Sequence, residues 1–260
     1  MTAPSGGGPQ RGPTLARIRA GVAGWSVPAA SAHRFPVEGS HLERYAARLP
    51  CVEINSSFYR PHRRTTYARW AASVPADFRF AVKLPKLITH ARRLVDCGEP
   101  LARFADETGG LGPKRGPVLV QLPPSFAFEA ARVEDFFAAF TATVGGPVAC
   151  EPRHPSWFAA EPEALLRRCG VARVAADPPP VPAAAQPAGW PGLAYVRLHG
   201  FPKIYWSAYG ETAVARHAAA ALDLARSGAE VWIVYDNTAA GAAADDALAL
   251  AEIAAAAASG

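Results

Sequence analysis

Eight short apolar runs, each about the length of a β-strand, recur along the chain. Most are continuously apolar instead of alternating, which is the pattern of parallel strands covered on both faces. The runs lie at residues 18–25, 51–58, 78–85, 116–123, 147–153, 171–177, 193–200 and 229–237. A chain with so many buried parallel strands needs a helix or long crossover between each pair, so the sequence predicts an α/β fold.

Helical segments separate most of these runs. Ser40, followed three residues later by Glu43, predicts a capping box that opens a helix, and Pro50 ends that helix. Three phenylalanines at helical spacing predict a second helix over residues 129–143. Two further segments rich in alanine and leucine predict helices at 211–226 and 240–257.

Eight strands alternating with helices in a 260-residue chain predict a TIM-type (β/α)8 barrel that forms a single domain over residues 17–260. The segment 176–192 has too many prolines for a helix, so we expect an irregular crossing between the sixth and seventh strands. A doubly wound open sheet is the alternative, but no glycine-rich dinucleotide loop follows the first strand. Residues 1–16 are rich in glycine and proline and are predicted to be a disordered tail.

Composition adds three expectations. No apolar run approaches the roughly 20 residues of a membrane helix, and the N-terminus lacks a secretory signal, so the sequence favours the cytoplasm and no membrane contact. The four cysteines show no metal or redox spacing and fit buried thiols in a reducing compartment. A net charge of +5 slightly favours an anionic partner.

Polar side chains follow most of the predicted strands at their carboxyl ends, where the active sites of such barrels lie. These residues are Glu53 and Asn55, Lys83, Gln121, Glu151 and Arg153, Asp177, Arg197 and His199, and Asp236 and Asn237. Residues two apart in a strand share a face, so three same-face pairs are expected: Glu53 with Asn55, Glu151 with Arg153, and Arg197 with His199. The sequence therefore predicts a polar mouth at one end of the barrel.

Several motifs together resemble the YecE-like family, catalogued as domain of unknown function seventy-two. They are VEINSSFYRP, FRFAVKLPKLITH, VLVQLPPSF, EPRHPSW, YVRLHG and VYDNT, in this order. The resemblance runs from about Gly21 to the last helix and implies a TIM-barrel-like fold without an established reaction. The chain departs from the family pattern with SAHRFP after the first strand, and with Asp236–Asn237 where the family has two asparagines.

The catalytic candidates are Glu53, Glu151, Lys83 and His199. The substrate-binding candidates are Asn55, Tyr59, Gln121, Arg153, Trp157, Asp177, Arg197, Tyr209, Asp236 and Asn237. The aromatic members would form a stacking wall for a planar or sugar-like body, and the arginines would grip its anionic group. Structural alternatives remain open: the Glu151–Arg153 pair could serve only as an ion pair, and His199 could only hydrogen-bond a neighbour.

The leading hypothesis is metal-free acid–base chemistry on a small anionic substrate that carries a phosphate or a carboxylate. In it, Glu53 or Glu151 is the base and Lys83 or His199 its partner, with no cofactor and no metal. A non-catalytic module that binds a nucleotide or single-stranded nucleic acid is the main alternative. A metal-dependent isomerase or phosphoesterase is a further alternative, and a glycosidase ranks below both. The oligomeric state stays open.

Overall fold

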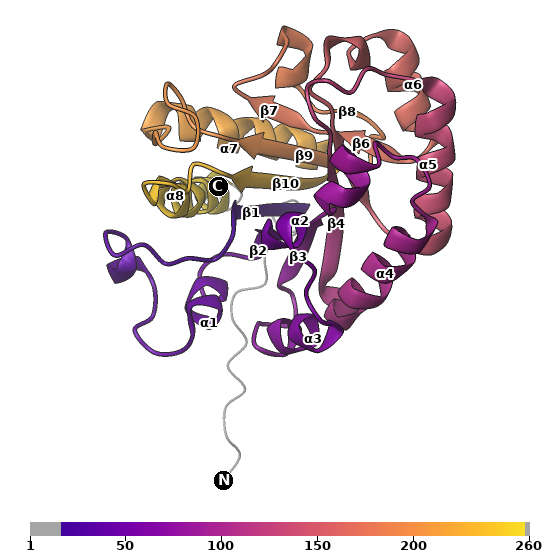
Figure 1. Cartoon of the computed structure of the whole chain (residues 1–260). Coiled ribbons are helices and arrows are strands. Elements are labelled where there is room, and N and C mark those ends of the chain that lie inside the picture. The colour runs from indigo at the N-terminus through magenta and orange to yellow at the C-terminus, as the bar shows by residue number, and fades with distance from the viewer. Residues whose placement is uncertain (1–16, 258–260) are drawn as a thin grey trace.

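The strands form one sheet that curls into a barrel, with the helices on its outside (Figure 1). The computed structural model describes residues 17–257. The sheet order is β7-β9-β10-β1-β2-β3-β4-β5-β6-β8. Every neighbouring pair is parallel except β6 and β8. The predicted barrel is therefore confirmed, while the expected tail at residues 1–16 lies outside the described residues.

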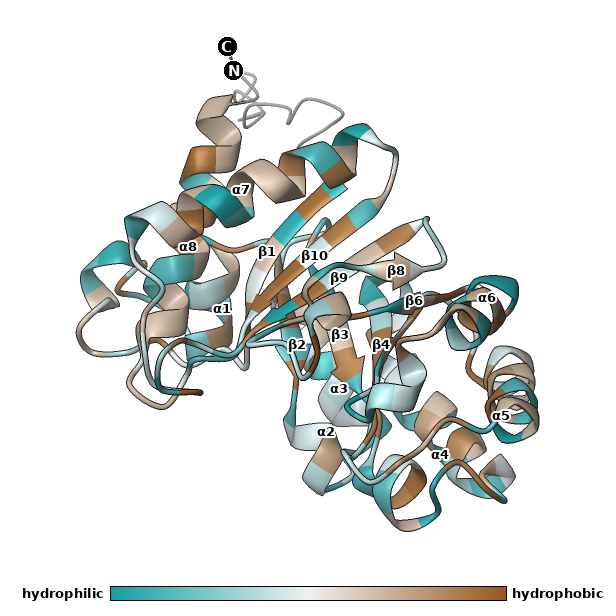
Figure 2. Ribbon diagram, turned by 90° about the horizontal axis from the view of Figure 1, so that it is seen from above, coloured by the Kyte–Doolittle hydropathy of each residue, from teal (hydrophilic) through white to brown (hydrophobic). Residues whose placement is uncertain are grey.

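Each of the eight predicted runs contains a strand. The strands are β1 (Ile18–Ala23), β2 (Cys51–Ile54), β3 (Arg79–Lys83), β4 (Arg115–Gln121), β5 (Val148–Glu151), β6 (Val171–Arg173), β7 (Ala175–Asp177), β8 (Ala188–Gly189), β9 (Leu193–Leu198) and β10 (Glu230–Tyr235). In Figure 2, β3 and β10 are hydrophobic along most of their length, whereas α5 and α6 carry many hydrophilic residues. This distribution is expected for strands buried between a barrel interior and an outer layer of helices.

The sixth predicted strand is broken in two, and this break closes the barrel. β6 pairs with β5, whereas β7 pairs with β9 at the other end of the sheet order. Only Val174 separates them, and its backbone N–H still donates to the carbonyl of Cys150. Because the chain passes directly from one end of the sheet to the other, the two edges meet.

The proline-rich crossing is irregular, as predicted, but it also contributes an unpredicted strand. It holds a short 3-10 helix, η6 (Pro182–Ala185), and then β8, which runs antiparallel to β6. Gly189 in β8 has a φ of +73°, and a Cβ there would lie 2.5 Å from the carbonyl oxygen of Val171. Only glycine fits this close approach.

The helices cover the outside of the sheet. They are α1 (His41–Ala46), α2 (Ser56–Tyr59), α3 (Arg64–Ala72), α4 (Gly98–Thr108), α5 (Ala130–Thr143), α6 (Ala160–Arg168), α7 (Glu211–Arg226) and α8 (Ala242–Ala257). The shorter turns are η2 (Ala32–Arg34), the π-helix η3 (Leu87–Ala91), η4 (Gly109–Lys114) and η5 (Pro155–Trp157). The predicted capping box is present, since the side chains and backbones of Ser40 and Glu43 bond reciprocally. No helix within residues 17–257 is long and apolar enough to cross a membrane.

The barrel interior has an apolar layer and, above it, a polar one. A separate buried cluster fills the apolar layer with side chains that include Cys51, Ala81, Leu119, Ala149 and Val234. Two residues further along the same strands stand Glu53, Lys83, Gln121, Glu151 and Asp236. Since side chains two apart share a face, the inward positions change from apolar to polar near the carboxyl ends. This change builds the candidate site.

Candidate active site

A buried arginine organises the polar layer of the barrel. The guanidinium of Arg197, from β9, is 1% exposed and contacts three carboxylates. Its Nε and Nη2 donate to Glu53 at 3.1 and 2.9 Å, and its Nη1 donates to Glu151 at 2.9 Å. Nη2 also donates to Asp236 at 2.8 Å. Strands from different parts of the chain are thereby joined through one planar cation, whose fork suits carboxylates.

His199 lies beside this network, two residues after Arg197. Its Nδ1 is 3.1 Å from Oδ2 of Asp236, while its Nε2 is 3.7 Å from Oε1 of Glu151. Burial lowers the pKa of His199, but the nearby carboxylates of Asp236 and Glu151 outweigh burial and raise the pKa above its ordinary value. The imidazole is therefore poised to carry a proton near neutral pH.

Two further cations flank the network. Arg153 donates from Nε and Nη2 to Oε1 of Glu151 at 3.1 and 2.7 Å, with its side chain 28% exposed. Lys83 is buried, with its Nζ 4.3 Å from the ring centre of Phe58. Burial, together with the charge of Arg197, lowers the pKa of Lys83 despite the nearby carboxylates.

The charges of the network balance. Glu53, Glu151 and Asp236 face the cations of Arg197, Arg153 and Lys83. Burial raises the pKa of both Glu151 and Asp236, but Arg197 and His199 reverse this effect, leaving the Asp236 pKa lowered and that of Glu151 well below its usual value. Both therefore stay ionised at neutral pH, and a protonated His199 adds one positive charge to the mouth.

A cavity of about 410 Å³ opens above this network. Its polar lining comes from Glu151, Arg153, His199 and Tyr205, and its other walls include the prolines of residues 178–180. The Nε2 atom of His199 is buried and has no hydrogen-bond partner among the described residues. A buried polar atom without a partner is costly and rare, so this nitrogen is the natural contact for a ligand in the cavity.

The structure brings half of the predicted site residues together. Glu53, Glu151, Lys83, Arg153, Arg197, His199 and Asp236 share the network just described. Glu53 is fully buried beneath it, with both oxygens engaged by Arg197 and one also by Tyr195. A carboxylate that is fully buried, with both oxygens hydrogen-bonded, cannot contact a substrate in the cavity. Its position therefore favours support of Arg197 over proton transfer.

The expected Glu53–Asn55 face is absent, because β2 ends at Ile54 and Asn55 has helical backbone angles. Oδ1 of Asn55 is buried and has no hydrogen-bond partner within residues 17–257. Gln121 pairs in register with Glu151, but its side chain forms no hydrogen bond with the network within residues 17–257. Tyr59, on α2, is 70% exposed and lines a different cavity.

Three residues predicted to contact a ligand instead bond to other parts of the protein. They are Trp157, Asn237 and Tyr209. Trp157 is 0% exposed, and its Nε1 donates to the carbonyl of Phe126 at 2.8 Å, so the prediction of a ligand-stacking role is wrong. Asn237 is fully buried and donates to the Ser207 carbonyl and to Asp246.

Tyr209 links two backbone segments through its hydroxyl group. Its hydroxyl donates to the carbonyl of Asp177 at 3.1 Å and accepts from the Gly200 N–H at 2.9 Å. Together with Asn237 it fixes the loop after β9 over the barrel, and in the described part of the chain the Asp177 side chain forms no hydrogen bond or ion pair with the network. These residues therefore position the mouth instead of lining it.

Tyr195 is a network member that the strand-end pattern did not single out. Its hydroxyl donates to Oε2 of Glu53 at 2.8 Å, deep inside the barrel. The signal that could have found it is the period of two, because Tyr195, Arg197 and His199 occupy alternate positions of one strand. A buried tyrosine hydroxyl needs a partner, and the facing carboxylate provides one.

Comparisons with known proteins agree with this architecture. A family model described as "Protein of unknown function DUF72" matches residues 19–260. The chain is 34% identical over 149 residues to UPF0759 protein YecE of Escherichia coli strain K12, covering 55% of this chain and 54% of that protein. YecE of Escherichia coli O157:H7 matches with the same figures. The chain therefore spans about half the length of the curated relatives it matches.

Two solved structures share the fold. A DUF72 family protein from Enterococcus faecalis V583 superposes with a TM-score of 0.77 at 22% identity, covering 91% of this chain and 95% of that one. A DUF72 family protein from Thermotoga maritima MSB8 gives 0.74 at 24% identity, covering 91% and 98%. At these identities the likeness shows the fold alone, but the family match extends over nearly the whole sequence. The chain belongs to the DUF72 family.

Proposed function

We propose that the barrel mouth binds a small substrate bearing a phosphate or carboxylate and acts on it by metal-free acid–base chemistry, with His199 as the proton donor. The observation that carries this proposal is the unpartnered Nε2 of His199, which is buried at the wall of the mouth cavity. Asp236 holds the opposite ring nitrogen at 3.1 Å, whereas Nε2 lies 3.7 Å from Oε1 of Glu151, beyond hydrogen-bond distance, so a proton on Nε2 is available to a ligand.

Arg153 would grip the anionic group. It is the half-exposed arginine of the mouth, and its Nη1 is not used in the hydrogen bonds to Glu151. A guanidinium that keeps a free donor beside a cavity suits a phosphate or carboxylate oxygen. Protonated His199 adds a second charge-assisted donor a short way off, so the anion would be held between the two side chains.

Proton transfer would then run from His199 Nε2 to a basic oxygen of the bound substrate. Asp236 stabilises the protonated ring before transfer and fixes its orientation afterwards. Of the two predicted bases, Glu151 is the one that lines the cavity, while Glu53 supports Arg197 from below. Lys83, with its lowered pKa, is a second group that could exchange a proton within the network.

The charge balance supports chemistry without a metal. A hard divalent ion is bound by carboxylates that are not already paired, and here each of the three is bonded to an arginine. Binding an ion would require the release of Arg197 from groups that it contacts at under 3 Å. The pairing of the carboxylates with arginines therefore favours metal-free chemistry over a metal-dependent isomerase or phosphoesterase.

The loop after β9 gives a specific reason to keep the nucleotide or single-stranded nucleic acid alternative. Phe201, Tyr205 and Trp206 are 64%, 44% and 48% exposed, and Lys203 lies over the ring of Trp206 at 4.2 Å. Exposed aromatics beside a cation can stack a base or the apolar face of a sugar. The same loop would serve either a catalytic or a purely binding mouth.

A thermal-shift screen with and without Arg153→Ala tests the anion site. The screen covers phosphosugars, nucleotides, carboxylic acids and short oligonucleotides, each with and without divalent metals. A ligand at about one hundred times its dissociation constant should add about 2.7 kcal/mol of stability to the wild type. We expect that shift to vanish in Arg153→Ala but to persist in Arg167→Ala, which removes an arginine from α6 away from the mouth.

The outcomes separate the alternatives. A shift that only metals produce would contradict the metal-free account, and a shift only with oligonucleotides would favour the nucleic-acid module. Once a ligand is known, His199→Gln should keep its binding within about tenfold while lowering turnover by a factor of about 10²–10⁴. Equal turnover in His199→Gln and wild type would exclude His199 as the proton donor.

A further inference from the structure

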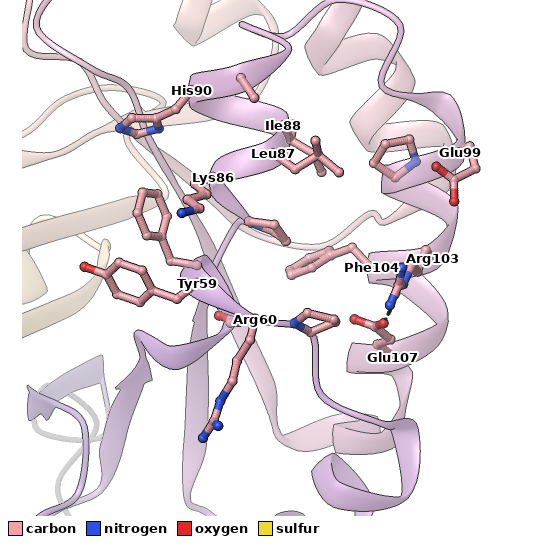
Figure 3. A pocket seen from close by; sticks show the side chains of 16 residues that line it. Tyr59, Arg60, Lys86, Leu87, Ile88, His90, Glu99, Arg103, Phe104 and Glu107 are labelled. Carbon is pink, nitrogen blue, oxygen red and sulfur yellow. Dashed lines mark hydrogen bonds and ion pairs between the residues drawn. The ribbon is translucent and has the colours of Figure 1, made fainter.

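A second cavity, of about 500 Å³, lies between α2, the π-helix η3 and α4 (Figure 3). It is distinct from the mouth cavity, because the two share no lining residue. The volume falls within the range of small-molecule sites. None of the residues predicted to be catalytic lines it, so it calls for a separate explanation.

The walls of this cavity are mainly apolar. Phe58, Ile88 and Phe104 form its inner surface, while Tyr59 and Leu87 stand at its opening, 70% and 49% exposed. Large apolar side chains that gather around a hollow and remain exposed indicate a surface for an apolar body. The aromatic rings on opposite sides suit a flat ligand.

Two cations that line the cavity, Lys86 and Arg60, have no carboxylate partner within residues 17–257, and Figure 3 shows the Arg60 side chain extending away from the cavity. Lys86 forms no ion pair or side-chain hydrogen bond with any residue in the range 17–257, whereas Arg103 and Glu107 on the far wall are paired at 2.8 Å. Figure 3 shows Lys86 on the side of Tyr59 and His90, with Glu99 and the Arg103–Glu107 pair on the opposite side. An unpaired ammonium next to an apolar cavity attracts an anionic group.

His90 does not add to this charge. It packs edge-on against Phe58, with ring centres 5.0 Å apart, and its Nδ1 is 2.9 Å from the hydroxyl of Thr89. Burial, followed by the charges of Lys83 and Arg153, lowers the pKa of His90, and Arg93 and Lys86 act in the same direction. The imidazole is therefore neutral at pH 7, which leaves Lys86 as the cation on this wall.

The backbone of this wall is unusual. Residues Leu87–Ala91 form a π-helix, a rare element that occurs frequently at functional sites. The following residues Arg93, Leu94 and Asp96 have positive φ angles of 49°, 66° and 50°. A left-handed leucine is strained, and strain of this kind gathers at ligand sites.

We propose that this cavity binds a small aromatic organic acid, with its carboxylate at Lys86 and its ring between Phe58, Ile88 and Phe104. The proposal does not depend on the chemistry at the barrel mouth. It does connect the two regions, because the Phe58 ring that walls the cavity is also the ring against which Lys83 packs at 4.3 Å. An occupant would therefore lie one aromatic ring away from the polar network.

The probe for this test is 1-anilinonaphthalene-8-sulfonate, an aromatic anion whose fluorescence rises in apolar surroundings. We expect saturable binding of one probe per chain to the folded protein. Lys86 is exposed, so Lys86→Gln should weaken binding about two- to fivefold, the range of an exposed charge pair. The uncharged analogue N-phenyl-1-naphthylamine should bind wild type and Lys86→Gln alike.

A matched pair at Leu87 separates charge from shape. Leu87 is half exposed, so both Leu87→Gln and Leu87→Glu should fold, which thermal melting verifies. We expect Leu87→Glu to bind the anionic probe about three- to tenfold more weakly than Leu87→Gln, because it places a negative charge at the opening. Arg153→Ala should retain wild-type affinity for the probe.

Two results would overturn the proposal. Equal probe affinity of Leu87→Gln and Leu87→Glu would mean that the probe does not enter this cavity. Loss of affinity in Arg153→Ala would place the probe at the barrel mouth instead. The first result does not bear on the anion screen described above, whereas the second would support an anion site at the mouth, so the two proposals can fail separately.

Discussion

Replacing Arg197 with methionine should lower the free energy of unfolding by about 3–5 kcal/mol, the usual loss when one partner of a buried ion pair is removed. Arg197 is 1% exposed and is bonded to Glu53, Glu151 and Asp236. Methionine fills similar space without a charge, so the three carboxylates would remain buried with only Arg153, Lys83 and His199 nearby. Chemical denaturation at pH 7.5, compared with wild type, measures the loss.

The loss should shrink as the pH falls. In the wild type the pKa values of Glu151 and Asp236 are lowered, so the stability they contribute is present above about pH 4.5 and is lost on acidification. Without Arg197 we expect burial to raise the same pKa values, so that protonation stabilises the folded variant as the pH falls. The difference between the two proteins should therefore be largest near neutral pH and smaller at pH 5.

Arg153→Met is the matched control. Arg153 is also bonded to Glu151, but its side chain is 28% exposed, and water can replace it. We expect a loss of about 1 kcal/mol, smaller than that of Arg197→Met, because Arg153 is partly exposed and Glu151 keeps its bond to Arg197. If Arg197→Met and Arg153→Met were equally stable, or if the Arg197→Met deficit grew on acidification, Arg197 would not be the centre of the network.

Trp157→Ala should cost about 3–5 kcal/mol of stability, as for large aromatic side chains in other protein cores. The Trp157 ring is 0% exposed and packs against Phe126 and Phe128 at ring-centre distances of 6.1 and 5.1 Å. Its Nε1 also bonds the Phe126 carbonyl, which would lose its partner. Trp157→Phe should cost less, because most of the volume is retained.

The control for Trp157 is Trp206→Ala. Trp206 is 48% exposed on the loop after β9, so its removal should change stability by no more than about 0.5 kcal/mol. Thermal and denaturant melting of the three variants compares them directly. A Trp157→Ala protein as stable as Trp206→Ala would contradict the buried position of Trp157 and restore it as a ligand contact.

The barrel could be predicted because its signals are local. Continuous apolar runs mark strands buried on both faces, and the Ser40–Glu43 box marks a helix start regardless of what surrounds it. The convergence of Glu151, Arg197 and Asp236 followed from one further rule, that parallel strands of a barrel end at the same rim. These residues lie far apart in sequence, but this rule alone predicts that they lie close together in the fold.

Other features depend on tertiary packing and could not be read from the sequence. Trp157 stands beside the polar motif EPRHP, yet η5 turns it into the core between Phe126 and Phe128. Asn55 falls just beyond the last strand residue, and a one-residue shift in a strand end changes the face on which a side chain lies. Which nitrogen of His199 faces the cavity depends on Asp236, a contact between two strands.

The cavity beside η3 also could not be predicted from the sequence. Its lining comes from three segments, and the π-helical turn has no distinctive signature in LITHA. The motif containing these residues was visible as a family resemblance, but its role as a cavity wall required the fold. The same applies to Tyr59, which the structure places at this cavity instead of at the mouth.

In the proposed mechanism, protonated His199 and Arg153 receive an anion at the barrel mouth. The most direct test is an NMR pH titration of the ¹⁵N-labelled histidine rings, with and without inorganic phosphate, in which His199→Gln identifies the signal. We expect the pKa of His199 to lie above 6.5 and to rise further with phosphate, because a nearby anion stabilises the imidazolium. In Arg153→Ala the response to phosphate should be lost. A His199 pKa below 6.5, or one that phosphate leaves unchanged in the wild type, would contradict the account.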